Sequence, residues 1–279
     1  MTGESFRALP GGVRREVLPA RATEDKALAH VPRGIAVTVT AMPVKGPKPV
    51  LDLATRLAAH GHRVVPHVPA RLLRDDAHLK DAVDRLRGAG VDDVFAPAGD
   101  AGPPAGPHDG APPLPRGLGE PGSPFAQAGI TGHPESHPLI HDDLTIQAMR
   151  AERAHATCIV SNLCFDPRLF GDRVGRVRRR GVPPPLRVGV AGPVQRARPL
   201  PMAAKIGVEE STRFPTGHAS WFPRFAAPGG HSPDRLPAGS AGALTEPSSA
   251  VAGLRVFTFH QIAETERWRR ALLDRAGER

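Results

Sequence analysis

The sequence has no tyrosine, only two cysteines and few aromatic residues of any kind. Aromatics make up 4% of its 279 residues, whereas 37 Lys and Arg outnumber 28 Asp and Glu. A basic chain can bind nucleic acid, but these basic residues are mostly dispersed and have few aromatic side chains beside them on which bases could stack. We therefore expect no nucleic acid partner. The excess of positive charge could instead serve to bind an anionic small ligand.

The scarcity of cysteine and of long apolar runs indicates in which cellular compartment the protein is expected. Cys158 and Cys164 lie six positions apart in one apolar stretch. On a regular strand they would share a face about 20 Å apart, too far for a disulfide bond. We expect two buried free thiols, which suits a reducing cytoplasm. No signal peptide is recognisable and no apolar run approaches about 18 residues, so we expect a cytoplasmic protein that makes no membrane contact.

Short β-branched runs recur along the chain and predict eight strands. The runs are Arg15–Leu18, Ile35–Ala41, Arg63–Val68, Asp93–Ala98, Gly129–His133, Cys158–Phe165, Leu186–Ala191 and Val256–Phe259. Segments of helical period separate many of them. These segments are Val50–Ala59, Leu79–Leu86, His141–Arg153, Arg196–Ile206 and Gln261–Leu273.

The alternation of strands and helices predicts an α/β fold, a single (β/α)8 TIM barrel. We place the barrel at residues 13–279, after an N-terminal extension at residues 1–12. A doubly wound open sheet is the alternative, but no GxGxxG loop follows the first strand. The chain has 32 prolines and 30 glycines, and both residue types are dense in Gly99–Pro124 and Pro215–Pro247. These two segments predict long loops or partly disordered insertions, with a short helix at Pro233–Leu244.

The ends of the predicted strands carry polar residues. In a TIM barrel the carboxyl ends of all strands surround one mouth, where active sites lie. Seven of the eight ends bear hydrogen-bonding or titratable groups: Glu16, Thr38 and Thr40, His67, Asp100, the segment 132–138, Asn162 with Asp166, and His260 with Gln261. Each group alone could be a turn, a helix cap or a structural hydrogen bond. Their convergence on one rim predicts a functional site.

The residues at the strand ends could instead form a metal site. His67, Asp100, His133, Glu135 and His137 are all of ligand type. However, a proline follows each of the two histidines of the pair His133 and His137, which disfavours a helix that presents both on one face. We expect no catalytic metal.

Six short motifs, in order, resemble those of one family. They are Arg15–Pro19 for Glu-x-x-Pro, Val65–His67 for Pro-His, Ala98–Asp100 for Gly-Asp, Gly132–Pro138 for Tyr-Pro-Glu-x-His-Pro, Ser161–Asp166 for Thr-Gln-x-x-Phe-Asp, and Val256–His260 for a closing Phe-x-Phe-x-x-Asn-type strand. The chain resembles the methylenetetrahydrofolate reductases from about residue 13 to 273, in particular their actinobacterial branch. The resemblance implies an oxidoreductase of one-carbon and methionine metabolism, which reduces 5,10-methylenetetrahydrofolate to 5-methyltetrahydrofolate with NADH or NADPH, through FAD.

The resemblance also implies roles for single residues. Glu16 would be the general acid that opens the five-membered ring of the folate, which suits a carboxylic acid whose pKa is raised in a dehydrated pocket. Asp100 would be the second catalytic residue and would hold the pterin. Asn162 and His260 would also bind the folate. The residues expected around the cofactor are Thr40, His67, His133, His137, Arg150 and Arg153.

The chain departs from the family pattern at three of these residues and at one further position. His133 replaces a Tyr, Asn162 a Gln and His260 an Asn, and Glu152 stands where the family has a Lys near the flavin phosphates. A carboxylate repels a pyrophosphate unless the neighbouring arginines dominate. Bound FAD and direct hydride transfer from NADH, which the resemblance to the actinobacterial branch implies, therefore both stay open. Two other functions also stay open: a divergent non-catalytic paralogue that binds folate or a partner, and a barrel lyase or hydrolase.

Overall fold

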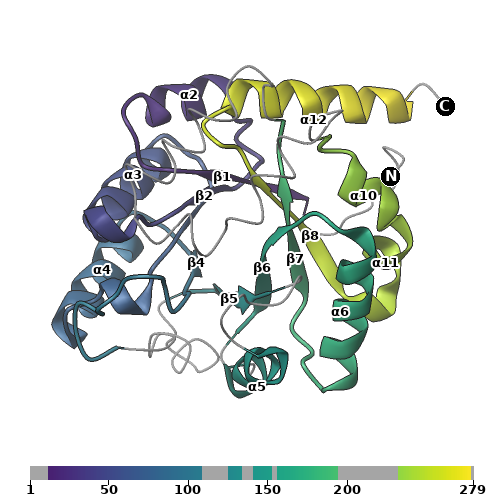
Figure 1. Ribbon diagram of the computed structural model, residues 1–279. Helices are drawn as coiled ribbons and strands as arrows, with labels where there is room; N and C mark the ends of the chain where they lie inside the picture. Colours follow the sequence, from purple (N-terminus) through teal and green to yellow (C-terminus); the bar gives the residue numbers. More distant parts are fainter. Residues whose placement is uncertain (1–11, 109–124, 134–140, 153–155, 194–231, 278–279) are drawn as a thin grey trace.

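The computed structural model describes residues 12–108, 125–133, 141–152, 156–193 and 232–277. Eight parallel strands form one sheet in the order β3-β2-β1-β8-β7-β6-β5-β4, and helices surround them on the outside (Figure 1). The strands are β1 (Val13–Val17), β2 (Val37–Val39), β3 (Val64–Pro66), β4 (Asp93–Phe95), β5 (Gln127–Gly132), β6 (Cys158–Cys164), β7 (Leu186–Ala191) and β8 (Val251–Phe257).

The two edges of this sheet meet between β3 and β4. His67, just after β3, forms a parallel bridge with Phe95, and the Val68 amide donates to the Phe95 carbonyl oxygen at 2.8 Å. The sheet thus curls into a nearly closed barrel, which confirms the predicted (β/α)8 fold. The proposed boundary after residue 12 stays a prediction, since residues 1–11 lie outside the described part of the chain.

Helices follow most of the strands. They are α2 (Thr23–His30), α3 (Lys48–Ala59), α4 (Asp76–Gly88), α5 (Asp142–Glu152), α6 (Pro167–Arg179), α10 (Arg235–Gly239), α11 (Ala241–Thr245) and α12 (Ile262–Gly277). The patterns in the sequence did not indicate α2 or α6, and the helix expected at Arg196–Ile206 lies outside the described residues. The short helix expected at Pro233–Leu244 is present as α10 and α11. None of the described helices is both long and apolar enough to cross a membrane.

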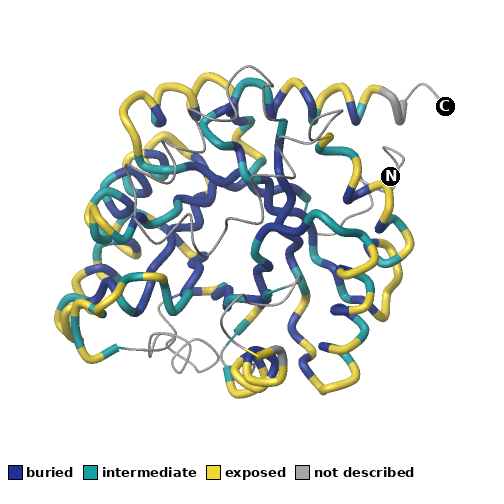
Figure 2. The backbone as a smooth tube through the Cα atoms, in the orientation of Figure 1, coloured by how far each residue is buried: buried dark blue, intermediate teal, exposed yellow. Residues whose placement is uncertain are grey.

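Alternate strand residues pack against these helices. Val37, Val39 and Val94 belong to a buried cluster with apolar residues of α3 and α4, such as Leu53, Leu57 and Leu86. The strands are buried along most of their length, whereas the helices expose their outer sides (Figure 2). A smaller cluster comprises Ala36, Val65, Phe95, Cys158 and Val160, the alternate residues that point into the barrel.

Strand β1 carries three consecutive buried charges, Arg14, Arg15 and Glu16. Because side chains alternate across a strand, Arg14 and Glu16 point into the barrel and Arg15 points out toward α12. Arg14 Nη2 pairs with Asp93 Oδ2 of β4 at 2.6 Å. Since β1 and β4 are not neighbours in the sheet, this ion pair crosses the interior of the barrel.

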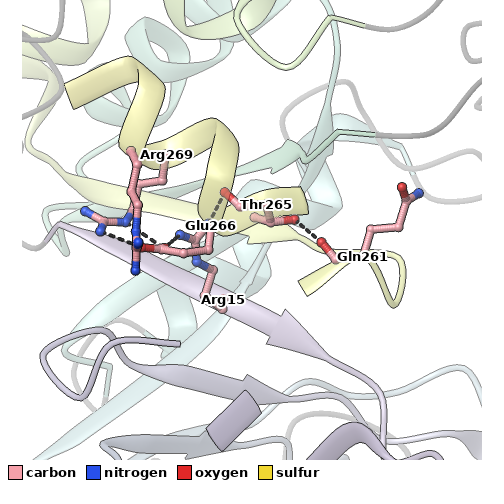
Figure 3. A network of polar contacts seen from close by, with 6 residues as sticks. Arg15, Gln261, Thr265, Glu266 and Arg269 are labelled. Atoms are coloured by element: carbon pink, nitrogen blue, oxygen red, sulfur yellow. Dashed lines mark hydrogen bonds and ion pairs between the residues drawn. The ribbon is translucent and has the colours of Figure 1, made fainter. Parts of the chain in front are cut away.

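Arg15 is fully buried between β1 and α12 (Figure 3). Its Nη2 lies 2.7 Å from Glu266 Oε2, and its Nη1 donates to the Thr265 carbonyl oxygen at 3.3 Å. Arg269 and Arg270 also donate to the Glu266 carboxylate. Although burial acts to raise it, these hydrogen bonds and the charge of Arg15 lower the pKa of Glu266 from 4.5 to about 2.

Replacing Glu266 should destabilise the barrel, because Glu266→Gln leaves the guanidinium of Arg15 buried without a countercharge. We expect a loss of about 3–5 kcal/mol in the free energy of unfolding at neutral pH, measured by urea denaturation. The more exposed pair of Glu264 and Arg267 provides the control. Glu264→Gln should cost no more than about 1 kcal/mol.

The difference in the free energy of unfolding between wild type and Glu266→Gln should also depend on pH. The folded-state pKa of Glu266 is depressed, so its contribution is complete above the unfolded-state value and is lost as the pH falls toward about 2. The difference should therefore shrink steadily below about pH 4.5. A difference that stays constant down to pH 2 would contradict this account of the network.

Candidate active site

A cavity of about 410 Å³ opens at the carboxyl ends of the strands. This volume lies near the lower end of the range for small-molecule sites. Of the ten site residues that the sequence indicated, seven line it: Glu16, Thr40, His67, Asp100, His133, Asn162 and His260. The structure thus brings most of the expected rim together around one space. His137 and Arg153 lie outside the described residues, and Arg150 is exposed and is not part of the lining.

Glu16 lies in the floor of this cavity and is only 8% exposed. Its Oε2 is 2.5 Å from Nη2 of Arg255, on the neighbouring strand β8. Burial raises the pKa of the Glu16 carboxyl, and the charge of Arg255 and the Thr40 hydroxyl oppose the rise without cancelling it. A carboxyl group with a raised pKa, beside a cavity, is suited to give a proton to a ligand.

Arg255 is the site residue that the sequence analysis missed. Its Nη2 also lies 3.0 Å from Nε2 of His67, across the interior of the barrel. Its guanidinium carbon is 5.1 Å from the ring centre of Phe95 and 4.9 Å from that of Phe257, within cation–π range. The predicted eighth strand began one residue later, at Val256. The signal that could have located the residue is a single charge inside an apolar run.

Asn162 reaches the cavity through an irregularity in β6. The register of β6 against β7 shifts between Val160 and Leu163, and the Asn162 side-chain oxygen accepts from the Leu163 amide at 2.8 Å. Gly189 of β7 permits this bulge, because a Cβ there would lie 2.6 Å from the Asn162 carbonyl oxygen. With that oxygen engaged, the Asn162 NH₂ group is the part that can donate to a ligand.

The bulge also corrects an expectation about the cysteines. Both are buried and free, as expected, but they do not share a face. Cys158 packs in the cluster inside the barrel, whereas Cys164 packs outside it with Phe170 of α6. The reason is the bulge, because one extra residue in a strand reverses the alternation beyond it.

The loop after β8 forms part of the rim in an uncommon conformation. Phe259 and His260 have φ values of 47° and 63°, in the left-handed region that non-glycine residues rarely adopt, and both line the cavity. Such backbone conformations cluster at ligand-binding sites, where the surrounding structure maintains them at a cost of about 1–3 kcal/mol each.

The described residues do not fit the pyrophosphate of a flavin dinucleotide. Glu152 lines the cavity, and burial raises the pKa of its carboxyl without an opposing cation among the described residues. Arg255 is already paired with Glu16, and burial together with Arg255 lowers the pKa of His67 well below 6.5, so His67 is neutral. The part of the lining that the structure describes therefore offers no uncommitted Lys or Arg to a phosphate.

The described residues also include no group of three or more His, Cys, Asp or Glu side chains placed to hold a metal ion. Of the residues weighed as ligands, His67, Asp100 and His133 line the cavity, whereas Glu135 and His137 lie outside the described part.

The buried pair of Glu16 and Arg255 should lower the stability of the protein. Replacing both by apolar residues of similar size, Glu16→Leu with Arg255→Met, should leave the free energy of unfolding unchanged or raise it by about 1–4 kcal/mol. At a pH above the pKa of Glu16, Glu16→Leu alone should lower it by about 3–5 kcal/mol, because a buried guanidinium is left without its carboxylate. Urea denaturation of the two single variants and the double variant gives their coupling energy. Strictly additive effects would contradict a direct interaction.

Comparison with known proteins identifies the fold. No protein-family model matches the sequence. Among solved structures, a tryptophan synthase from M. tuberculosis is 14% identical, with a TM-score of 0.50 over 99% of this chain and 97% of that one. A dihydropteroate synthase from Thermus thermophilus is 13% identical, with a TM-score of 0.43 over 93% of this chain and 92% of that one. Similarity at this level of identity concerns the fold and not the activity.

Proposed function

We propose that this chain is an NADH- or NADPH-dependent oxidoreductase that reduces 5,10-methylenetetrahydrofolate to 5-methyltetrahydrofolate. The observation that carries the proposal is the position of Glu16, a buried carboxyl with a raised pKa in the floor of a cavity. The resemblance to methylenetetrahydrofolate reductases assigns the general acid to this same residue. The chemistry of the site and the sequence motifs, which are independent observations, thus support one role.

Glu16 would begin the reaction. Its proton passes to N10 of the folate, the bond between N10 and the methylene carbon breaks, and an iminium forms at N5. The hydride of the nicotinamide then adds to the methylene carbon, which becomes the methyl group, and NAD(P)⁺ leaves. One proton and one hydride are consumed, and Glu16 regains its proton from water.

Asp100 and Asn162 would orient the pterin. Both line the cavity that Glu16 faces. The carboxylate of Asp100 can accept hydrogen bonds from the amino group and ring N–H of a pterin, and the NH₂ group of Asn162 can donate to a ring nitrogen or carbonyl oxygen. His260, at the rim, is the third residue proposed to bind the folate. The free thiols of Cys158 and Cys164 suit a cytoplasmic enzyme.

The proposal routes the hydride directly from the nicotinamide to the folate. A prosthetic flavin must be anchored through its pyrophosphate between turnovers, and Glu152 makes the described wall unfavourable for that group. A dinucleotide co-substrate needs only its nicotinamide ring in the cavity, beside Thr40 and His133, and its phosphates can stay outside.

Glu16→Gln tests the proposal. A glutamine keeps the shape of the side chain but has no acidic proton, so we expect NADH oxidation that requires the folate to fall at least about 100-fold. Folate affinity, measured by calorimetry, should stay within a few-fold. Glu264→Gln, on the outer surface of α12, serves as the control and should retain full turnover. Unchanged turnover in Glu16→Gln would remove this residue from the mechanism.

The visible spectrum tests the route of the hydride. The purified protein should be colourless and active, with no flavin absorbance band, and added FAD should not raise its rate. A yellow protein that loses its activity when the flavin is removed would contradict direct transfer.

A non-catalytic folate-binding protein is the second candidate, motivated by the three departures at His133, Asn162 and His260. Folate binding by calorimetry, with no NADH or NADPH oxidation, would select it. A lyase or hydrolase of this fold would instead be indicated by stoichiometric metal in the active protein.

A further inference from the structure

The guanidinium of Arg255 joins two residues of the site through one nitrogen. Its Nη2 lies 2.5 Å from Glu16 Oε2 and 3.0 Å from His67 Nε2. An arginine can only donate, so the neutral ring of His67 accepts at Nε2 and carries its own proton on Nδ1. Nη2 therefore donates to His67, just after β3, and the same nitrogen forms the ion pair with Glu16 on β1. This arrangement fixes the direction from which the guanidinium meets the carboxylate.

Aromatic rings take the place of water around this cation. Phe95 comes from β4 and Phe257 from β8, and the Arg255 side chain is almost fully buried. His67 meets Phe95 edge to face, with ring centres 4.7 Å apart. These four neighbours, among the described residues, each come from a strand or a strand end. The rotamer of Arg255 is thus constrained by packing, by the hydrogen bond with His67 and by the ion pair with Glu16.

The charge of Arg255 matters most after Glu16 has lost its proton. Before transfer, the floor of the cavity holds a neutral acid beside a buried cation. After transfer it holds a carboxylate beside that cation, at 2.5 Å and out of water. The product of the proton transfer is therefore stabilised where charge develops, by a group already in place.

We propose that Arg255 is the positioning residue of this site: it aims the carboxyl of Glu16 at the ligand and stabilises the carboxylate that proton transfer leaves. This inference rests on the proposed reductase function. It differs from a purely structural ion pair in one respect, since it requires that the rate of turnover, and not only the proton affinity of Glu16, depend on Arg255.

Other groups around Glu16 do not provide this charge. Thr40, after β2, contributes a hydroxyl, and the Thr258 hydroxyl donates to the Glu16 main-chain oxygen at 2.7 Å. His67 is neutral, and Asp100 lies at the rim of the same cavity. Arg14, two residues earlier on β1, pairs with Asp93. Among the described residues, Arg255 is thus the cation paired with the Glu16 carboxylate.

The dependence of kcat on pH tests the proposal. Activity requires protonated Glu16, so kcat falls as the pH rises through the pKa of this group. Arg255→Gln removes the cation that opposes the raised pKa, and the fall in kcat should move about 1–3 pH units higher. Its plateau should drop about 100-fold, because the carboxylate is no longer stabilised. Arg255→Lys keeps the charge, so the pH at which kcat falls should shift by less than in Arg255→Gln.

Two further variants separate positioning from folding. Arg87→Gln, the same substitution at an exposed site on α4, should leave the profile and the melting temperature unchanged. His67→Gln can still accept from Arg255 through its side-chain oxygen and should retain more activity than His67→Leu. A purely structural role predicts instead that Arg255→Gln lowers stability and shifts the fall, but leaves the plateau of kcat within a few-fold of the wild-type value. That result would overturn the proposal.

A titration that needs no turnover completes the test. In protein labelled with ¹³C at the glutamate Cδ, the resonance of Glu16 is the one missing from Glu16→Gln. Its midpoint should be about 1–3 units higher in Arg255→Gln than in the wild type. Equal midpoints would overturn the role of Arg255 alone. A shifted midpoint in a protein that never oxidises NADH in the presence of folate would overturn the proposed function alone.

Discussion

Three adjacent charges on β1 constrain the rest of the structure. Each of Arg14, Arg15 and Glu16 is buried, and each has its countercharge on a different element: Asp93 on β4, Glu266 on α12 and Arg255 on β8. A buried charge without a partner costs several kcal/mol, so these pairs can form only when both ends of the chain and the opposite wall of the barrel have come together. A shift of β1 by one residue would send every charge to the wrong face.

Of the ion pairs made by β1, the pair with Glu266 contributes to stability and the pair with Arg255 belongs to the candidate site. The partner of Arg15 is a carboxylate whose pKa is lowered, and three arginines keep Glu266 ionised. The partner of Arg255 is a carboxyl whose pKa is raised, because Glu16 faces the cavity floor and burial outweighs the cation. The outward pair fastens α12 to the sheet. The inward pair places the carboxyl of Glu16, which can carry a proton, beside the cavity where a ligand can bind.

Sequence reasoning located the fold and most of the rim because both depend on local pattern. Apolar runs mark the strands, and residues at strand ends meet at the mouth of a barrel whatever the loops do. It missed Arg255 because the partners of this residue, Glu16 and His67, are distant in the sequence and become neighbours only in the folded barrel. It placed Cys164 on the wrong face because a bulge, which Gly189 permits, breaks the alternation. It passed over α6, although the helix begins with an Asp166 cap and a proline and buries Phe170, Val174 and Val177 at helical spacing.

The central claim is that the cavity above Glu16 is where a hydride passes directly from a nicotinamide to a one-carbon unit on folate. Isotope transfer measures this most directly. NADH that carries deuterium at the transferable position of C4 is supplied with 5,10-methylenetetrahydrofolate, and the product is analysed by mass spectrometry. Our account predicts 5-methyltetrahydrofolate with one deuterium in its methyl group. A methyl group without deuterium, whose hydrogen came from an exchangeable intermediate, or the absence of any methylated product would contradict it.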